Sequence, residues 1–405
     1  MKNENNFLFI FNGAMIISGT AIGAGMLALP LISSGIWFSF ALILLLITCY
    51  VTYSSSLYLL ETSMAFDVDY NYVSLSYKTL GTIGHYIATF SVTFVPFILL
   101  YAYSSGGGSI IQKLLFQLLD ITILTSQATV IFNGLLVTCL FFGSYFVDKV
   151  CSISVIIMSI ALLMVISMMS MHVSSDYLFP TVSVSERIGY VWFILPIFIT
   201  SFGFHATFPS IIKHFERNIK HVTYSLMIGI GTCFVLYALW LLVFMGNVER
   251  SVLMTLGDNA NLATFVTLLS RNIDSKWMNY TLSVFSQFAV ATSFLGVGLG
   301  IIDAVKDWFQ LKETKNNHIF TVLFVFIPIT FFSYFYPDYF VSAIQYAALF
   351  ATIFIVILPP LMALQVRRKN LPTKYKVSGG QVRLWFVLLF GIIGFILEFY
   401  QKILE

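Results

Sequence analysis

Long apolar runs separated by short polar segments dominate the chain. An apolar helix of about 20 residues crosses the hydrocarbon core of a bilayer, and about eleven runs approach or exceed that length. The runs are apolar on every side, which is typical of membrane-spanning helices. Their approximate limits are 7–30, 33–60, 83–106, 128–146, 150–171, 189–212, 222–245, 277–301, 319–335, 339–364 and 384–400.

The composition supports this prediction. Apolar residues make up 59% of the chain and charged residues 10%, whereas about 25% is usual for soluble proteins. This excludes a soluble enzyme, a disordered chain and a disulfide scaffold. The net charge of +3 gives no basic surface for nucleic acid, and the four cysteines have no metal-site spacing. We therefore predict an all-α integral membrane protein, one transmembrane domain over 1–405, in contact with lipid and without catalytic residues, metal or cofactor.

The positions of Lys and Arg predict the orientation. If the N-terminus is cytoplasmic, most of the 21 Lys and Arg residues lie in cytoplasmic segments, as the positive-inside rule requires. An odd number of spans then places the C-terminus outside. The basic inner segment 371–383 is expected to be a solvated loop that touches anionic lipid. Residues 258–269 predict a short helix, either a lid on the outer vestibule or an interfacial helix.

Two apolar runs are interrupted near their middles. The first contains Ser-Gly-Thr-Ala-Ile-Gly-Ala-Gly at 18–25, and the sixth contains Thr-Ser-Phe-Gly-Phe-His at 200–205. Because the two runs are five apart, a five-plus-five inverted repeat is predicted, 7–171 and 189–364, with 384–400 as an additional helix. The alternative is that Gly and Pro are simply common in membrane helices.

An interrupted membrane helix leaves backbone N–H and C=O groups without partners, which is costly in hydrocarbon. A zwitterionic amino acid satisfies both kinds of group. Its carboxylate would accept from N–H groups around Ala24 and Gly25, at the positive end of the outer half-helix. Its ammonium would donate to carbonyls around Ala21 and around Ser201 or Phe202. The interruptions therefore predict an amino acid site.

Four segments carry a resemblance to a known family. They are 19–30 (GTAIGAGMLALP), 200–211 (TSFGFHATFPSI), 291–300 (ATSFLGVGLG) and 376–380 (KVSGG). Together they resemble the bacterial aromatic amino acid permeases, the tyrosine-specific and tryptophan-specific transport proteins. The resemblance implies the amino acid–polyamine–organocation superfamily, with its LeuT-like fold and broken helices 1 and 6, and secondary transport at the bacterial inner membrane.

The resemblance also implies the residues of the substrate site. Matched by position, they are Thr20, Ala21, Ile22, Gly23, Ala24 and Gly25 in the first interruption and Ser201, Phe202, Gly203 and Phe204 in the second. Tyr101 lies on span three, which lines the site in this fold, so an aromatic substrate could stack on Tyr101 or on Phe204. Packing is the alternative role of both rings.

The coupling ion is left open between two choices. A proton is the expectation for the family. In sodium-driven relatives of the fold, a hydroxyl pair on span eight helps to hold a cation beside span one, and Thr292 and Ser293, with the Ala21 carbonyl, match that place. Some proton-coupled relatives carry a lysine on span five, and 154–160 contains none. His205, an ionisable residue in the second interruption, is either a proton-sensitive group or substrate donor, or a neutral histidine that satisfies a freed carbonyl.

These observations favour a secondary active transporter that imports tyrosine or tryptophan by proton-coupled symport and alternating access. The alternatives within the superfamily are a serine/threonine-type permease and a sodium-coupled permease. A membrane enzyme is disfavoured, because the spans contain no HExxH motif, carboxylate pair or nucleophile elbow. An ion channel is disfavoured because no ring of charged residues would line a pore.

Overall fold

The computed structural model describes residues 2–66, 70–255, 262–272, 276–312 and 314–404. Within these ranges all regular structure is helical. Eight of the described helices are long and apolar enough to cross a membrane, or nine if the bent pair α1–α2 is one span. The prediction of an all-α membrane protein is therefore confirmed, whereas the count of eleven spans remains a prediction.

The helices follow the order of the apolar runs along the chain. The first half contains α1 (Lys2–Ala21), α2 (Ala24–Ile32), α3 (Trp37–Met64), α4 (Tyr72–Leu119), α5 (Thr125–Phe141), α6 (Ser144–Ser170) and α7 (Ser175–Leu178). The second half begins with α8 (Val184–Ser201), α9 (Phe208–His214), α10 (Ile219–Met245), α11 (Arg250–Met254), α12 (Leu262–Asn272) and α13 (Lys276–Trp308). It ends with α14 (Lys315–Phe335), α15 (Phe340–Thr352), the π-helix η1 (Ile353–Ile357), α16 (Leu358–Arg368) and α17 (Gly380–Leu404).

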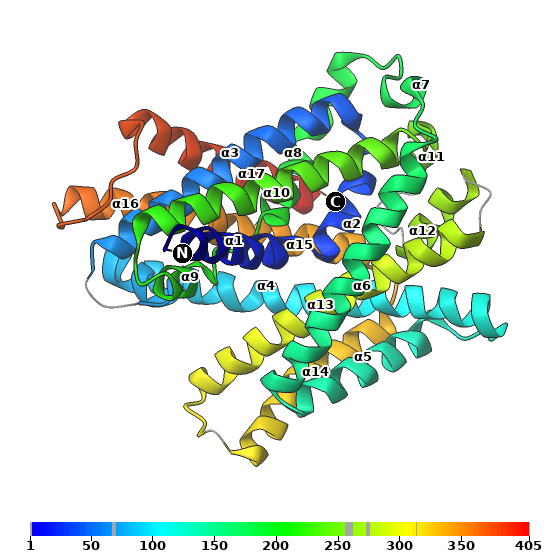
Figure 1. The fold of residues 1–405 in the computed structure, drawn as a ribbon, viewed down its shortest axis with the longest axis horizontal. Coiled ribbons are helices and arrows are strands. Elements are labelled where there is room, and N and C mark those ends of the chain that lie inside the picture. The colour runs from blue at the N-terminus through cyan, green and yellow to red at the C-terminus, as the bar shows by residue number, and fades with distance from the viewer. Residues whose placement is uncertain (1, 67–69, 256–261, 273–275, 313, 405) are drawn as a thin grey trace.

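The helices form two groups. In Figure 1, α1, α3, α8 and α10 lie together on one side, and α5, α13 and α14 lie together on the other, with α4 between them. The contacts agree, because α1 packs on α10, α3 packs on α8 and α10, and α13 packs on α4 and α6. This arrangement places both interrupted spans in one group and the Thr292–Ser293 pair in the other.

The third span differs from its predicted limits. Its apolar run was expected to end at Gly106, but α4 continues to Leu119. The glycines are used for packing: a Cβ on Gly107 would lie 2.4 Å from the Phe132 ring, and one on Gly108 would lie 2.1 Å from Thr129 Oγ1. They therefore let α5 approach α4 closely instead of ending the helix. The helical path bends earlier, at Gly81, which has a positive φ of 74°.

The basic segment 371–383 is fastened to α3 rather than freely solvated. Glu61 of α3 is fully buried and forms a two-point ion pair with Arg367, with N···O distances of 2.6 and 2.7 Å. The Val377 N–H donates to the same carboxylate at 2.8 Å. Burial raises the pKa of the Tyr375 phenol in this segment. The expectation of a solvated loop was wrong for these inward-facing residues, although Lys374 remains exposed.

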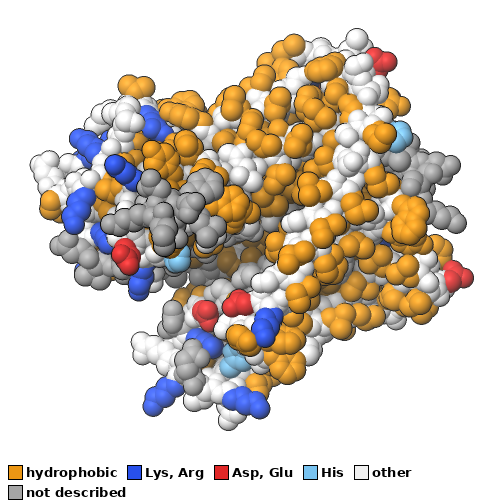
Figure 2. Space-filling view, in the orientation of Figure 1, with side chains coloured by type: hydrophobic (Ala, Val, Ile, Leu, Met, Phe, Trp, Pro, Cys, Tyr) orange, Lys and Arg blue, Asp and Glu red, His pale blue; other side chains and the backbone are white. Residues whose placement is uncertain are grey.

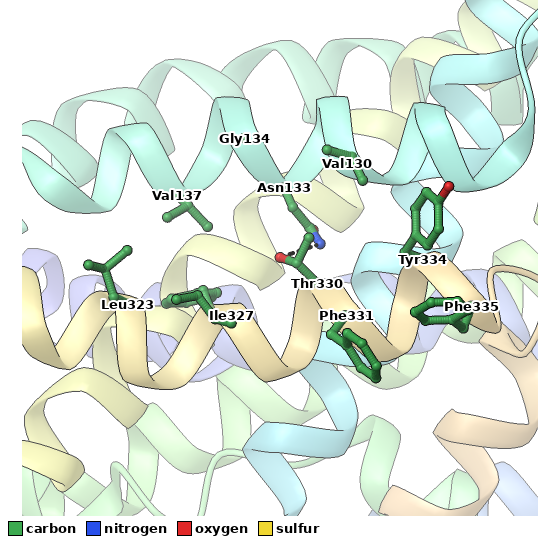
Figure 3. A pocket seen from close by; sticks show the side chains of 11 residues that line it. Val130, Asn133, Gly134, Val137, Leu323, Ile327, Thr330, Phe331, Tyr334 and Phe335 are labelled. Atoms are coloured by element: carbon green, nitrogen blue, oxygen red, sulfur yellow. Dashed lines mark hydrogen bonds between the residues drawn. The ribbon is translucent and has the colours of Figure 1, made fainter.

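Two grooves open on the apolar surface. Figure 2 shows hydrophobic side chains over most of one face, with Lys and Arg gathered toward one end. One groove, of about 400 Å³, lies between α5 and α14 (Figure 3). On its floor Asn133 Nδ2 donates to Thr330 Oγ1 at 3.1 Å and Ser333 Oγ at 3.3 Å, tying the two helices together. Such hydrogen bonds between membrane helices typically contribute about 1 kcal/mol.

Candidate substrate site at two helix interruptions

The first interruption is a sharp bend after Ala21. The segments 9–21 and 25–32 make an angle of 55°, and Ile22 and Gly23 lie outside both helices. The last helical hydrogen bond of α1 joins Ile22 N to Ser18 O. The first hydrogen bond beyond the bend joins Met26 N to Gly23 O at 3.1 Å. The helix α2 therefore starts afresh, with the N–H groups of its first turn directed into the bend.

The second interruption is longer. The helix α8 ends at Ser201 and α9 begins at Phe208, with tight turns between them. Gly203 N donates to Thr200 O at 2.8 Å, and Thr207 N donates to Phe204 O at 3.0 Å. Both predicted interruptions are therefore present in the structure, and each leaves backbone carbonyls outside regular helix.

Tyr237 of α10 joins the two interruptions. Its hydroxyl lies 2.8 Å from Ala21 O and 2.6 Å from Ser201 O, and its side chain is fully buried. A hydroxyl has one hydrogen, so it donates to one carbonyl at a time while the other lacks a full partner. The Phe202 ring packs against Tyr237 with centroids 5.3 Å apart. Tyr237 was not among the predicted site residues, because a lone tyrosine in an apolar run gives no sequence signal.

Ser293 of α13 lies against the first interruption. A Cβ on Gly23 would lie 2.3 Å from Ser293 Oγ, so only glycine leaves room for this hydroxyl. Ser293 Oγ also bonds to Ala289 O of its own helix at 2.9 Å, and Thr292 Oγ1 bonds to Phe288 O at 2.8 Å. The structure thus brings Ser293 beside Gly23, as the predicted cation site requires, whereas the bonds of Thr292 stay within α13.

His205 lies in the second interruption and faces α3. Ser56 Oγ donates to Thr52 O at 2.8 Å, so it accepts from the Nε2–H of His205 at 3.1 Å. The Phe204 ring packs beside His205, with centroids 4.8 Å apart, and both side chains are buried. This geometry holds the ring on α3 through Nε2, while Nδ1 is buried without a hydrogen-bond partner among the described residues.

The remaining predicted residues divide into two sets. Gly25 lies where the two interruptions meet, because a Cβ on Gly25 would lie 3.9 Å from Ser201 Oγ. Thr20 is exposed and bonds to Ile16 O of its own helix. Tyr101 donates to Tyr336 O at 2.8 Å and lines a separate groove of about 480 Å³ between α4 and α15. Tyr101 and Thr20 are therefore not joined to the other candidates by these contacts.

A π-helical turn in the tenth apolar run is a further feature without a sequence signal. Ser55 of α3 donates to Ile355 O in this turn, and Tyr72 donates to Phe354 O. A Cβ on Gly203 would lie 3.2 Å from Ile355 Cδ1, so the turn packs on the second interruption. Single π-turns often occur at functional sites.

Interrupted membrane helices whose free carbonyls converge are typical of secondary transporters. Comparison with known sequences shows which transporters this multi-pass membrane protein belongs with. It is a member of the tryptophan/tyrosine permease family, whose model matches residues 8–398. This confirms the resemblance found in the four sequence segments. The family and its members are permeases rather than enzymes.

Individual relatives match along nearly their whole length. The tryptophan-specific transport protein of Haemophilus influenzae is 34% identical over 397 residues, which are 96% of this chain and 95% of the relative. The tyrosine-specific transport system 1 of the same organism is 33% identical over 384 residues, 94% of each chain. The low affinity tryptophan permease of Proteus vulgaris is 32% identical over 400 residues, 98% of this chain and 96% of the relative.

Proposed function

We propose that this permease imports tryptophan or tyrosine across the bacterial inner membrane by ion-coupled symport and alternating access. The observation that carries the proposal is the convergence of Ala21 O, Ser201 O and Tyr237 Oη where the two interruptions meet. An ammonium group has three N–H donors and no acceptor, so three oxygens suit it. The N–H groups that begin α2, at Ala24 and Gly25, would receive the carboxylate.

The packing of the helices supports a five-plus-five inverted repeat, 7–171 and 189–364, followed by 384–400. In such a repeat α1 corresponds to α8, α3 to α10, α4 to α13 and α6 to α15. The contact of α1 with α10 then corresponds to that of α8 with α3, and the contact of α4 with α15 corresponds to that of α13 with α6. Both members of each pair occur. Two such repeats of opposite orientation would allow the group containing the interruptions to rock against the other group. The excess of Lys and Arg in alternate segments supports a cytoplasmic N-terminus, and 11 spans would then leave the C-terminus outside.

Uptake into proteoliposomes tests the substrate. Labelled tryptophan should accumulate with saturable kinetics, and unlabelled tyrosine should compete more strongly than serine or threonine, because the ring of an aromatic substrate would contact buried aromatic side chains such as Phe202. Liposomes without protein are the control. Uptake that is nonsaturable would contradict the transporter, and preferred uptake of serine or threonine would favour the alternative permease.

The coupling ion is proposed to be a proton, with sodium as the second candidate. The place of Ser293 beside Gly23 favours sodium, since a serine oxygen and a carbonyl are suitable ligands for a hard cation. A pH gradient of about one unit without sodium supplies about 1.4 kcal/mol per proton, so it should raise the accumulation of substrate about tenfold above that without a gradient. Uptake that follows only a sodium gradient, and falls in Ser293→Ala, would replace the proton by sodium.

A further inference from the structure

Buried polar atoms without partners lie near the end of α4 and the start of α13, two helices that pack on each other. Six such atoms lack a hydrogen bond to any residue that the structure describes: Lys113 Nζ, Gln117 Oε1, Asn279 Oδ1, Ser283 Oγ, Ser286 Oγ and Gln287 Oε1. Polar atoms buried in a folded protein are normally satisfied by protein, water or ligand. Six unsatisfied atoms from two packed helices therefore indicate a place that water or a ligand fills.

The polar atoms of α13 lie on one face of the helix. Asn279, Ser283 and Ser286 follow helical spacing, and continuing the same face reaches Ser293, which lies against Gly23. A row of polar side chains therefore extends along α13 from its outer end to the first interruption.

Aromatic contacts show which way this face points. On one flank Phe285 packs on Trp240 of α10, with ring centroids 5.5 Å apart. On the other flank Phe294 packs on Phe132 of α5, also at 5.5 Å. The polar face lies between these flanks, its Ser293 end lies against the first interruption, and α13 packs on α4. It is an inner face of the protein rather than a lipid-facing one.

Lys113 supplies the positive charge of this region. Its side chain is only 9% exposed, and its ammonium is unpaired among the described residues. It lies two helical turns beyond Gly106, on the same face of α4. A Cβ on Gly106 would lie 2.6 Å from Phe340 at the start of α15 and 3.4 Å from Leu262 of α12. The face of α4 that carries Lys113 is therefore covered by the starts of α12 and α15, and α13 packs on both α4 and α12.

We propose that Lys113 and the polar face of α13 form an outer subsite that binds the carboxylate of an amino acid on its way to the interruptions. The proposal rests on the transport function proposed above. A buried ammonium without a counter-ion is costly, and a carboxylate pairs with it directly. Ser283 and Ser286 can donate to the same carboxylate, while the amide oxygens of Gln117 and Asn279 can accept from the ammonium of the amino acid.

Competition with two partial substrates tests the proposal in proteoliposomes. Indole-3-propionate has the carboxylate but no ammonium, and tryptamine has the ammonium but no carboxylate. Replacing Lys113 with methionine should raise the inhibition constant of indole-3-propionate against tryptophan uptake about tenfold, with that of tryptamine unchanged within about twofold. Lys113→Arg keeps the charge and should remain close to the parent protein. Unchanged constants for both inhibitors in Lys113→Met would overturn the proposal.

The outcomes separate the subsite from the transport function. If the parent protein transports no aromatic amino acid, the proposed function fails first and the subsite falls with it. In the other case the parent protein transports, and the only effect of Lys113→Met is to change how much anionic lipid raises the melting temperature. Lys113 then pairs with a lipid phosphate, so the subsite is overturned while the transport function stands.

Cysteine accessibility gives a second measurement that does not depend on a folded Lys113 variant. In protein without its four native cysteines, Ser283→Cys and Ser286→Cys should react with a membrane-impermeant methanethiosulfonate added outside, and tryptophan should slow the reaction. Phe285→Cys is the matched control, because Phe285 is also fully buried but packs on Trp240 of α10, away from the polar face. Equal reaction at all three positions, or none at the two serines during turnover, would overturn the proposal.

Discussion

Replacing Gly23 with valine is expected to reduce amino acid uptake to the background of empty liposomes while the protein still folds. Any Cβ at this position would lie 2.3 Å from Ser293 Oγ, and the two further carbons of valine add to the overlap. The interruption must then open or α13 must move, and overpacking of this kind costs about 1–3 kcal/mol. Because the same shift would displace the Ala21 carbonyl, the loss should appear in uptake more than in melting temperature.

Two variants identify the cause of that loss. Gly19→Ala is the matched control: Gly19 lies one helical turn before Gly23 but has nothing within 4 Å of a Cβ, so uptake should stay near the parent value. Gly23→Ala should lower uptake about tenfold, and adding Ser293→Ala should recover part of it, because the nearest remaining atom, Ser293 Cβ, is 3.6 Å away. Full uptake by Gly23→Val would remove Gly23 from the site.

The interruptions could be predicted from sequence because their cause is local. Gly23, Gly25 and Pro30 weaken one helix, and Gly203 and Pro209 weaken another, within a few residues of each site of unwinding. The position of Ser293 beside the first span was instead predicted from the family resemblance, because no local sequence pattern joins α13 to α1. The family comparison confirms the membership on which that inference was based.

The features that could not be predicted depend on pairs of residues far apart in the chain. Tyr237 reaches carbonyls 216 and 36 positions away, and Glu61 pairs with Arg367 across 306 positions. Neither pair leaves a periodic trace, because each partner is one residue in an otherwise ordinary apolar or basic segment. The continuation of α4 through Gly106 was missed for a related reason: whether a glycine ends a helix or receives a neighbouring helix is decided by tertiary packing.

Tyr237→Phe is expected to raise the KM for tryptophan about thirtyfold with a smaller change in the maximum rate. The substitution removes the hydroxyl that contacts Ala21 O and Ser201 O and keeps the ring that packs on Phe202. The ammonium of the substrate would lose its third oxygen, and a hydrogen bond from a charged group contributes about 1.5–3 kcal/mol. Uptake at a series of tryptophan concentrations in proteoliposomes measures the effect.

Tyr58→Phe is the matched control for this change. Tyr58 is also a fully buried tyrosine, but its hydroxyl has no hydrogen-bond partner among the described residues, so its removal should leave KM within about twofold of the parent value. The sign of the change at Tyr237 distinguishes two roles for the hydroxyl. If the Tyr237 hydroxyl only occupies the ammonium position while no substrate is bound, it competes with the ammonium, and Tyr237→Phe would then lower KM. A rise in KM requires the hydroxyl to act together with the two carbonyls, as the convergence of three oxygens at one point indicates.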